Sequence, residues 1–223
     1  MHIPDGFIDI KTSAAFAAAS ALAVAGAVKG ARRQLSEQSA PLAGLTAVFI
    51  FAVQMLNFPV AAGTSGHLIG AALAMVLVGP YAATLALVVV LIIQAFLFAD
   101  GGLTALGLSI FNMAVISVWV SFAVFMLMKK IFPKTKSWLV IATFVSALIS
   151  VPAAAVGFVI QYAIGANATF SVSAVLNAMV GTHIIIGIGE AIITALTVSA
   201  VLASRSDLVF GWDRKNTTLE IRS

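Results

Sequence analysis

The chain has 223 residues, of which 61% are hydrophobic and 9% are charged, and its mean hydropathy is +1.12. This composition excludes ordinary soluble domains and predicts an all-α polytopic membrane protein, in which each spanning helix satisfies its own backbone hydrogen bonds. The lack of cysteine excludes thiolate metal sites, disulfides and thiol catalysis, and the net charge of +4 does not indicate nucleic-acid binding, because the cations lie in loops.

The chain begins with a polar segment, MHIPDGFIDIK, ahead of the first apolar run. Its first dipeptide offers three nitrogen donors, namely the α-amine of Met1 and the backbone nitrogen and imidazole Nδ1 of His2. Bound to one metal ion, these atoms would close two small chelate rings and fill three corners of a square. We expect Met1 to be retained, because a bulky second residue disfavours its removal. Residues 1–12 are therefore predicted to be a metal-binding segment, and an ordinary frayed terminus is the alternative.

A secretory signal peptide is the competing interpretation of this region. The run 13–28 is apolar, and residues 23–25 (AVA) resemble a cleavage site. The preceding leader, however, carries Asp5 and Asp9 against a single Lys11, which is the wrong charge for a signal peptide. We therefore favour retention of the segment. Cleavage would remove all three nitrogen donors.

Apolar runs predict seven transmembrane helices in a single transmembrane domain, residues 1–223. In chain order the runs are 13–28, 42–58, 67–79, 81–98, 103–128, 138–163 and 172–204. The third run is short for a full crossing. The preceding stretch, 59–67, is rich in proline, glycine and small polar residues, and we expect it to be a loop that enters the bundle. Such backbone is tolerated at membrane depth only where protein buries it or where it lines a cavity.

The basic residues predict the orientation of these helices. With seven spans, eleven of the twelve basic residues fall on one side, and only Lys11 falls on the other. The eleven are Lys29, Arg32, Arg33, Lys129, Lys130, Lys134, Lys136, Arg205, Arg214, Lys215 and Arg222. The positive-inside rule makes that side cytoplasmic. The N-terminus, the loop before His67 and the turn at Asp100 are therefore predicted to lie outside, and residues 205–223 to form a cytoplasmic tail.

His67 is the best candidate for a fourth nitrogen ligand. It follows a Gly-Thr-Ser-Gly stretch at the predicted start of the third helix, where Thr64 or Ser65 could act as N-cap. A helix N-terminus disfavours protonation of an imidazole, and a neutral imidazole is the form that binds metal. A square of four nitrogens suits Ni(II) or Cu(II) and could accept Co(II), whereas Zn(II) prefers tetrahedral sites. The alternative is a histidine that only closes its loop against water or a backbone carbonyl.

Two polar residues of the last helix could also carry chemistry. Glu190 is the only ionisable carboxylate deep within a predicted span, and His183 lies seven residues earlier on the same face. The pair could form a proton path, a second metal site or a structural hydrogen-bonded link between helices, and we favour the structural link. Further buried polar residues are expected to join helices: Gln54, Asn57, Gln94, Asn112, Gln161 and Asn177.

Three stretches carry a family resemblance: MHIPDGF at the start, GTSGHLIGAAL around His67 and GTHIIIGIGEAIITA around His183. Together they resemble the CbiM/NikM family, the substrate-binding membrane components of energy-coupling-factor transporters for cobalt and nickel. The resemblance covers essentially the whole chain. It implies a seven-helix protein of the prokaryotic cytoplasmic membrane that captures Ni(II) or Co(II) with Met1, His2 and His67. The Pro4-Asp5 pair, in place of the MHIME start common in cobalt-associated members, leans toward nickel.

The resemblance also implies partners. These are a transmembrane coupling component, a pair of cytoplasmic ATPases and a small accessory membrane protein. The chain itself is then not an enzyme, in keeping with the absence of a P-loop pattern. The resemblance assigns no ligand role to Ser65, His183 or Glu190, which we expect to support the site or the fold.

Two other functional classes remain open from the residues. One is a stand-alone secondary transporter that uses Glu190 as a proton carrier. The other is an intramembrane metalloenzyme with His67, His183 and a bound water. Such an enzyme needs an open coordination position, whereas a closed square of four nitrogens leaves no room for a reacting water in the plane.

Overall fold

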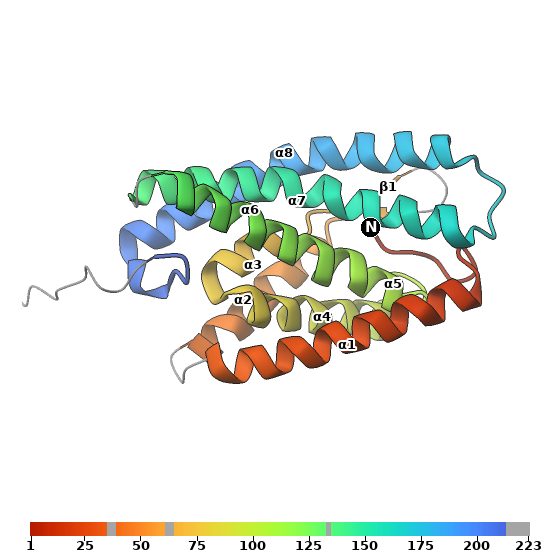
Figure 1. Cartoon of the computed structure of the whole chain (residues 1–223), viewed down its shortest axis with the longest axis horizontal. Helices are drawn as coiled ribbons and strands as arrows, with labels where there is room; N and C mark the ends of the chain where they lie inside the picture. The colour runs from red at the N-terminus through yellow and green to blue at the C-terminus, as the bar shows by residue number, and fades with distance from the viewer. Residues whose placement is uncertain (35–38, 61–64, 133–134, 213–223) are drawn as a thin grey trace, which may run out of the picture.

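The computed structural model describes residues 1–34, 39–60, 65–132 and 135–212, and these form a bundle of helices (Figure 1). The α-helices are α1 (Ile10–Gln34), α2 (Ser39–Gln54), α3 (Ala71–Val78), α4 (Pro80–Leu97), α5 (Leu106–Ile110), α6 (Ser117–Ile131), α7 (Lys136–Gly165) and α8 (Val172–Ser204). A π-helical segment, η2 (Phe111–Ile116), joins α5 to α6, and a 3-10 turn, η3 (Ser206–Leu208), follows α8. Between α2 and α3, strands β1 (Phe58–Pro59) and β2 (Ser65–Gly66) pair antiparallel.

The all-α membrane character predicted from composition is confirmed. Five helical stretches in the described part of the chain are long and apolar enough to cross a bilayer. They are α1, α4, the continuous run Leu106–Ile131, α7 and α8. The other two predicted runs are shorter helices, since α2 has 16 residues and α3 has 8. The count of seven crossings and the sidedness therefore remain predictions.

Helix α3 is the centre of the bundle. All eight of its residues are buried, and it packs against α2, α4, α6, α7 and α8. A helix that is apolar on every side is surrounded either by lipid or by other parts of the protein, and the burial of all eight residues shows that protein surrounds α3. The residues just before α3, including His67, are consequently held deep in the protein.

The predicted start of this helix at residue 67 was wrong. Helix α3 begins at Ala71, and its N-cap is Gly70, whose φ of 77° lies in the left-handed region and interrupts the helix. Ser65 belongs to β2 and does not cap the helix, and Thr64 lies outside the described residues. His67 therefore lies in non-helical backbone between β2 and α3, so a helix dipole cannot be what keeps its imidazole neutral.

The N-terminal segment turns back into the bundle. Ile8 forms a β-bridge with Ala166 just after α7, and the backbone N–H of Asp9 donates to the carbonyl of Gly165 at 2.7 Å. From there the chain runs inward, and Figure 1 shows the N-terminus within the bundle beside α7. The basic ends of α1 and α6 lie at the opposite end of the bundle (Figure 1). Lys134, Arg214, Lys215 and Arg222 lie outside the described residues.

Candidate metal centre

The first residues of the chain are buried. Met1 is 0% exposed and His2 is 4% exposed. An ammonium group in such a position would lose its hydration, and this burial lowers the pKa of the Met1 α-amine from 8.0 to about 4 despite the opposing attraction of Asp100. Burial also lowers the pKa of His2 well below its usual value, with a smaller contribution from the nearby amine. Both groups are therefore neutral at pH 7 and have lone pairs available for a metal.

Asp5 and Asp9 fix the path of the N-terminal segment. Asp5 accepts hydrogen bonds from the backbone N–H of Leu103 and Thr104, at 3.2 and 2.8 Å, and from the Thr104 hydroxyl. These bonds, the Thr104 hydroxyl foremost, lower the pKa of Asp5. Asp9 accepts from the backbone N–H and the hydroxyl of Thr12 and so caps the start of α1. The segment is thus anchored at both of its carboxylates.

Two glycines between α4 and α5 allow the N-terminal segment to lie close to this turn. The backbone N–H of Gly102 donates to the carbonyl of Ile3 at 2.8 Å. A Cβ on Gly102 would collide with the backbone nitrogen and carboxylate of Asp5. A Cβ on Gly101, whose φ is +91°, would lie 3.1 Å from Nδ1 of His2. The first five residues can therefore pack against the turn between α4 and α5 only because Gly101 and Gly102 have no side chains.

The loop that carries His67 is held from two other helices. Glu190 of α8 accepts hydrogen bonds from the backbone N–H of Ile69 at 2.6 Å and of Gly70 at 3.0 Å. Gln54 of α2 donates its side-chain N–H to the carbonyl of Ile69 at 2.7 Å. The backbone N–H and carbonyl of Ile69 and the N–H of Gly70 are therefore satisfied by buried side chains instead of by a helix.

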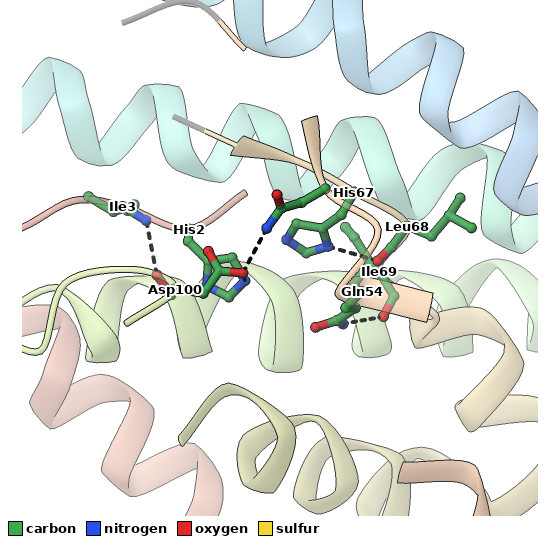
Figure 2. A network of polar contacts seen from close by, with 9 residues as sticks. His2, Ile3, Gln54, His67, Leu68, Ile69 and Asp100 are labelled. Carbon is green, nitrogen blue, oxygen red and sulfur yellow. Dashed lines mark hydrogen bonds and ion pairs between the residues drawn. The ribbon is translucent and has the colours of Figure 1, made fainter. Parts of the chain in front are cut away.

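The two histidine rings meet at the centre of the site (Figure 2). The rings of His2 and His67 have centroids 4.9 Å apart and an interplanar angle of 30°. Nδ1 of His67 lies 2.8 Å from the carbonyl of Leu68, so this nitrogen carries the proton and Nε2 carries the lone pair. Nε2 of His67 is buried and has no hydrogen-bond partner within the described residues. An unpartnered buried lone pair is costly, and a metal ion would satisfy it.

A cleft of about 520 Å³ reaches the site from the protein surface. Its lining includes His2, Ser65, Asn57 and Asp100. Asp100 accepts a hydrogen bond from the Asn57 side chain at 2.9 Å, and its carboxylate lies 3.6 Å from Nε2 of His2. Burial raises the pKa of Asp100, and the Met1 amine opposes this shift. The cleft offers a hydrated cation a polar route to His2.

His183 and Glu190, for which we favoured a structural hydrogen-bonded link between helices, make hydrogen bonds to different partners. Nδ1 of His183 lies 2.6 Å from the carbonyl of Met179, one turn earlier in the same helix. Glu190 instead reaches the His67 loop, as described above. The buried hydroxyl of Ser65 has no hydrogen-bond partner within the described residues. Glu190 therefore joins α8 to the loop, and His183 is satisfied at Nδ1 by its own helix.

Side-chain chemistry alone does not reveal this site. No group of three or more His, Cys, Asp or Glu residues that could hold a metal occurs in the described parts of the chain. Two of the four expected donors, the α-amine and the His2 amide nitrogen, belong to the backbone, so a search for ligating side chains passes over them. The sequence placed the turn at Asp100 on the same face as the N-terminus but did not predict its contact with His2.

Comparison with known proteins agrees with the architecture. The family described as "Cobalt uptake substrate-specific transmembrane region" (CbiM) matches residues 2–208. The cobalt transport protein CbiM of Sorangium cellulosum is 31% identical over 217 residues, covering 94% of each chain. The fused nickel transport protein NikMN of Rhodobacter capsulatus is 42% identical over 127 residues, covering 57% of this chain and 37% of that protein.

Solved structures show the same fold. The crystal structure of a truncated transition metal transporter superposes with a TM-score of 0.80 at 32% identity, covering 91% of this chain and 99% of that one. The CbiM match takes in nearly all of the helical bundle, together with His2, His67, His183 and Glu190. The chain therefore belongs to the CbiM family and is an integral membrane component of cobalt or nickel transport.

Proposed function

We propose that this protein is the substrate-capture subunit of an energy-coupling-factor ABC importer for Ni(II) or Co(II). In this proposal the ion binds from the outside to four nitrogen atoms, and the protein delivers it inward when partner ATPases hydrolyse ATP. The observation that carries the proposal is the buried, neutral α-amine of Met1 in the same segment as His2, whose ring lies beside that of His67. Burying a chain terminus in this way needs a compensating interaction.

The four ligands are the Met1 α-amine, the His2 backbone nitrogen, Nδ1 of His2 and Nε2 of His67. The His2 amide must lose its proton to bind, and Ni(II) and Cu(II) promote that loss far better than Mg(II) or Ca(II). The lone pair on Nε2 of His67 supports its place in the set, because Nδ1 faces the Leu68 carbonyl. Four nitrogens in a plane favour Ni(II), with Co(II) as the second substrate.

Glu190 and Gln54 act as supports of the His67 loop. Their hydrogen bonds hold the backbone on either side of the Ile69 peptide, two residues from the ligand. Ligands that are held by a second set of groups keep their geometry and affinity for the metal. His183 has a structural role in this proposal, and Ser65 lines the access cleft.

The partners are a transmembrane coupling component, a pair of cytoplasmic ATPases and a small accessory membrane protein. The name of the Rhodobacter capsulatus relative, a fused nickel transport protein, supports a multi-component system. The proposed topology has the N-terminus outside and the tail 205–223 in the cytoplasm. In this arrangement the ATPases provide the energy for uptake, and this chain captures the ion and delivers it.

Uptake of nickel by cells or proteoliposomes tests the coupling. We expect accumulation only when the coupling component and active ATPases are present, and an ATPase active-site variant should abolish it. The rival is a stand-alone proton-coupled transporter that uses Glu190. Uptake that persists without ATPases and disappears in Glu190→Gln would establish that rival and refute the importer.

A further inference from the structure

The turn between α4 and α5 is built at a conformational cost. Ala99 has a φ of 52°, which lies in the left-handed region, and Gly101 follows with a φ of 91°. A non-glycine residue in that region costs about 1–3 kcal/mol and persists only where surrounding contacts determine it. Between these residues stands Asp100, with its backbone N–H bonded to the Gln94 carbonyl at 3.0 Å. The strained backbone thus fixes the position of the Asp100 carboxylate.

That carboxylate faces one nitrogen of the His2 ring. Oδ2 of Asp100 lies 3.6 Å from Nε2 of His2, and the two side chains are 15% and 4% exposed (Figure 2). Asn57 donates to the same oxygen at 2.9 Å and fixes its position. A shift of less than about 1 Å would bring the pair to hydrogen-bond distance, and such contacts commonly tighten when a site is filled.

The other ring nitrogen is left accessible. A Cβ at position 101 would lie 3.1 Å from Nδ1 of His2, so glycine keeps that edge of the ring open. A carboxylate only accepts hydrogen bonds, so the nitrogen beside Asp100 is the one that carries the proton. The Asp100-Gly101 pair therefore presents His2 with its proton on Nε2 and its lone pair on Nδ1.

We infer that Asp100 is a positioning residue that holds His2 in the Nε2–H tautomer, with Nδ1 free to bind the metal. This inference rests on the proposed function, in which Nδ1 of His2 is a metal ligand. It also balances charge. A divalent ion bound by a neutral amine, a deprotonated amide and two neutral imidazoles carries a net charge of +1, and the Asp100 carboxylate neutralises it inside the protein.

Nitrogen-15 NMR of histidine-labelled, metal-free protein tests the inference directly, because long-range N–H couplings distinguish the two imidazole tautomers. The His2 signals are identified by their loss in His2→Ala. We expect the Nε2–H tautomer in the natural protein and a mixture of tautomers in Asp100→Ala. Asp207→Asn, which changes an exposed carboxylate paired with Arg205, is the matched control and should leave His2 unchanged.

Titration with NiCl₂ provides the second measurement. We expect Asp100→Ala to weaken Ni(II) binding by about 10- to 100-fold, the usual effect of removing a group that orients a metal-binding histidine. Asp100→Asn keeps an oxygen acceptor and should fall between the natural protein and Asp100→Ala, which gives a reading even if the alanine variant fails to fold. An Nδ1–H tautomer in the natural protein, or a His2 tautomer unchanged in Asp100→Ala, would overturn the inference.

The two measurements separate this inference from the proposed function. If the natural protein shows the Asp100-dependent tautomer and yet binds no Ni(II), the four-nitrogen site fails and the positioning role of Asp100 stands. If Ni(II) binds normally and the tautomer does not depend on Asp100, the four-nitrogen site stands and the positioning role of Asp100 fails.

Discussion

Residues 1–9 carry His2 and residues 65–70 carry His67, and the two segments are held by different kinds of contact. The N-terminal segment relies on Asp5 and Asp9, whose hydrogen bonds are mostly exposed, and on close packing against Gly102. The His67 loop relies on buried bonds from Glu190 and Gln54.

The difference matters because water competes with exposed hydrogen bonds and not with buried ones. A typical hydrogen bond contributes about 0.5–1.5 kcal/mol, whereas leaving a buried group unsatisfied costs about 1–3 kcal/mol. The hydrogen bonds of the N-terminal segment are therefore cheaper to break than those of the His67 loop. We expect this segment to adjust more readily than the His67 loop when its contacts are altered.

Removing or displacing a ligand should have the largest effect. His2→Ala, His67→Ala and an alanine inserted between Met1 and His2 should each weaken Ni(II) binding by more than about 100-fold, because each loses at least one of four nitrogens, beyond the effect of losing a supporting group. The insertion moves the amine out of the chelate without removing any side chain. Isothermal titration with Ni(II) measures the loss.

His183→Ala is the control for this series. Its Nδ1 is bonded within α8, so the variant should bind Ni(II) and show its effect in stability or transport. A loss of binding as large as that of His67→Ala would contradict the assignment of His183 as structural.

Glu190→Gln should have the next largest effect, about 10- to 100-fold on Ni(II) affinity. The amide keeps one oxygen acceptor for two backbone N–H groups, so the loop at Ile69 and Gly70 loosens. Thr84→Val is the matched control, since Thr84 is equally buried but bonds only to its own helix. Equal affinities for both variants would show that the loop does not need Glu190.

Gly102→Ala should weaken binding less, by about tenfold, because Asp5, whose hydrogen bonds are exposed, can partly adjust around the new Cβ. The methyl group would collide with Asp5. Gly44→Ala is the control, because a Cβ there meets nothing within 4 Å. Hydrogen exchange should show faster exchange at the Ile3–Gly102 contact in Gly102→Ala and no change at Ile69. Unchanged exchange at both places would contradict the packing argument.

The smallest predicted effect is a difference in pH dependence between the protein and the free peptide MHIPDGF. Protons compete with metal for the amine, so a peptide amine with an ordinary pKa near 8 loses affinity as pH falls below 8. Burial lowers the pKa of the Met1 amine to about 4. The amine of the protein stays unprotonated until pH approaches 4, so its affinity should fall less steeply between pH 8 and 5. Parallel curves for protein and peptide would contradict a buried amine.

The helices could be predicted from the sequence because burial in lipid requires long apolar runs. Six of the seven predicted runs begin within three residues of the start of a helix in the structure. The third run failed because hydropathy does not register that Gly70 adopts a left-handed φ, so the stretch from His67 to Gly70 read as helix. The π-helical turn at η2 likewise leaves no mark in the apolar pattern.

The candidate site was only partly predictable. The pattern of basic residues put His2 and His67 on one side of the membrane, and the structure brings their rings together. Nothing local in the sequence indicated that Asp100 faces His2 or that Glu190 reaches Ile69, because those contacts join residues about a hundred positions apart. Such pairs depend on how the helices pack.

Metal analysis with absorption spectroscopy on the purified protein tests the central claim most directly. We expect one Ni(II) per chain and an absorption band typical of square-planar, diamagnetic nickel, both lost when an alanine separates Met1 from His2. An insertion variant that binds Ni(II) with the same stoichiometry and the same band would contradict it, because the α-amine could then not be a ligand.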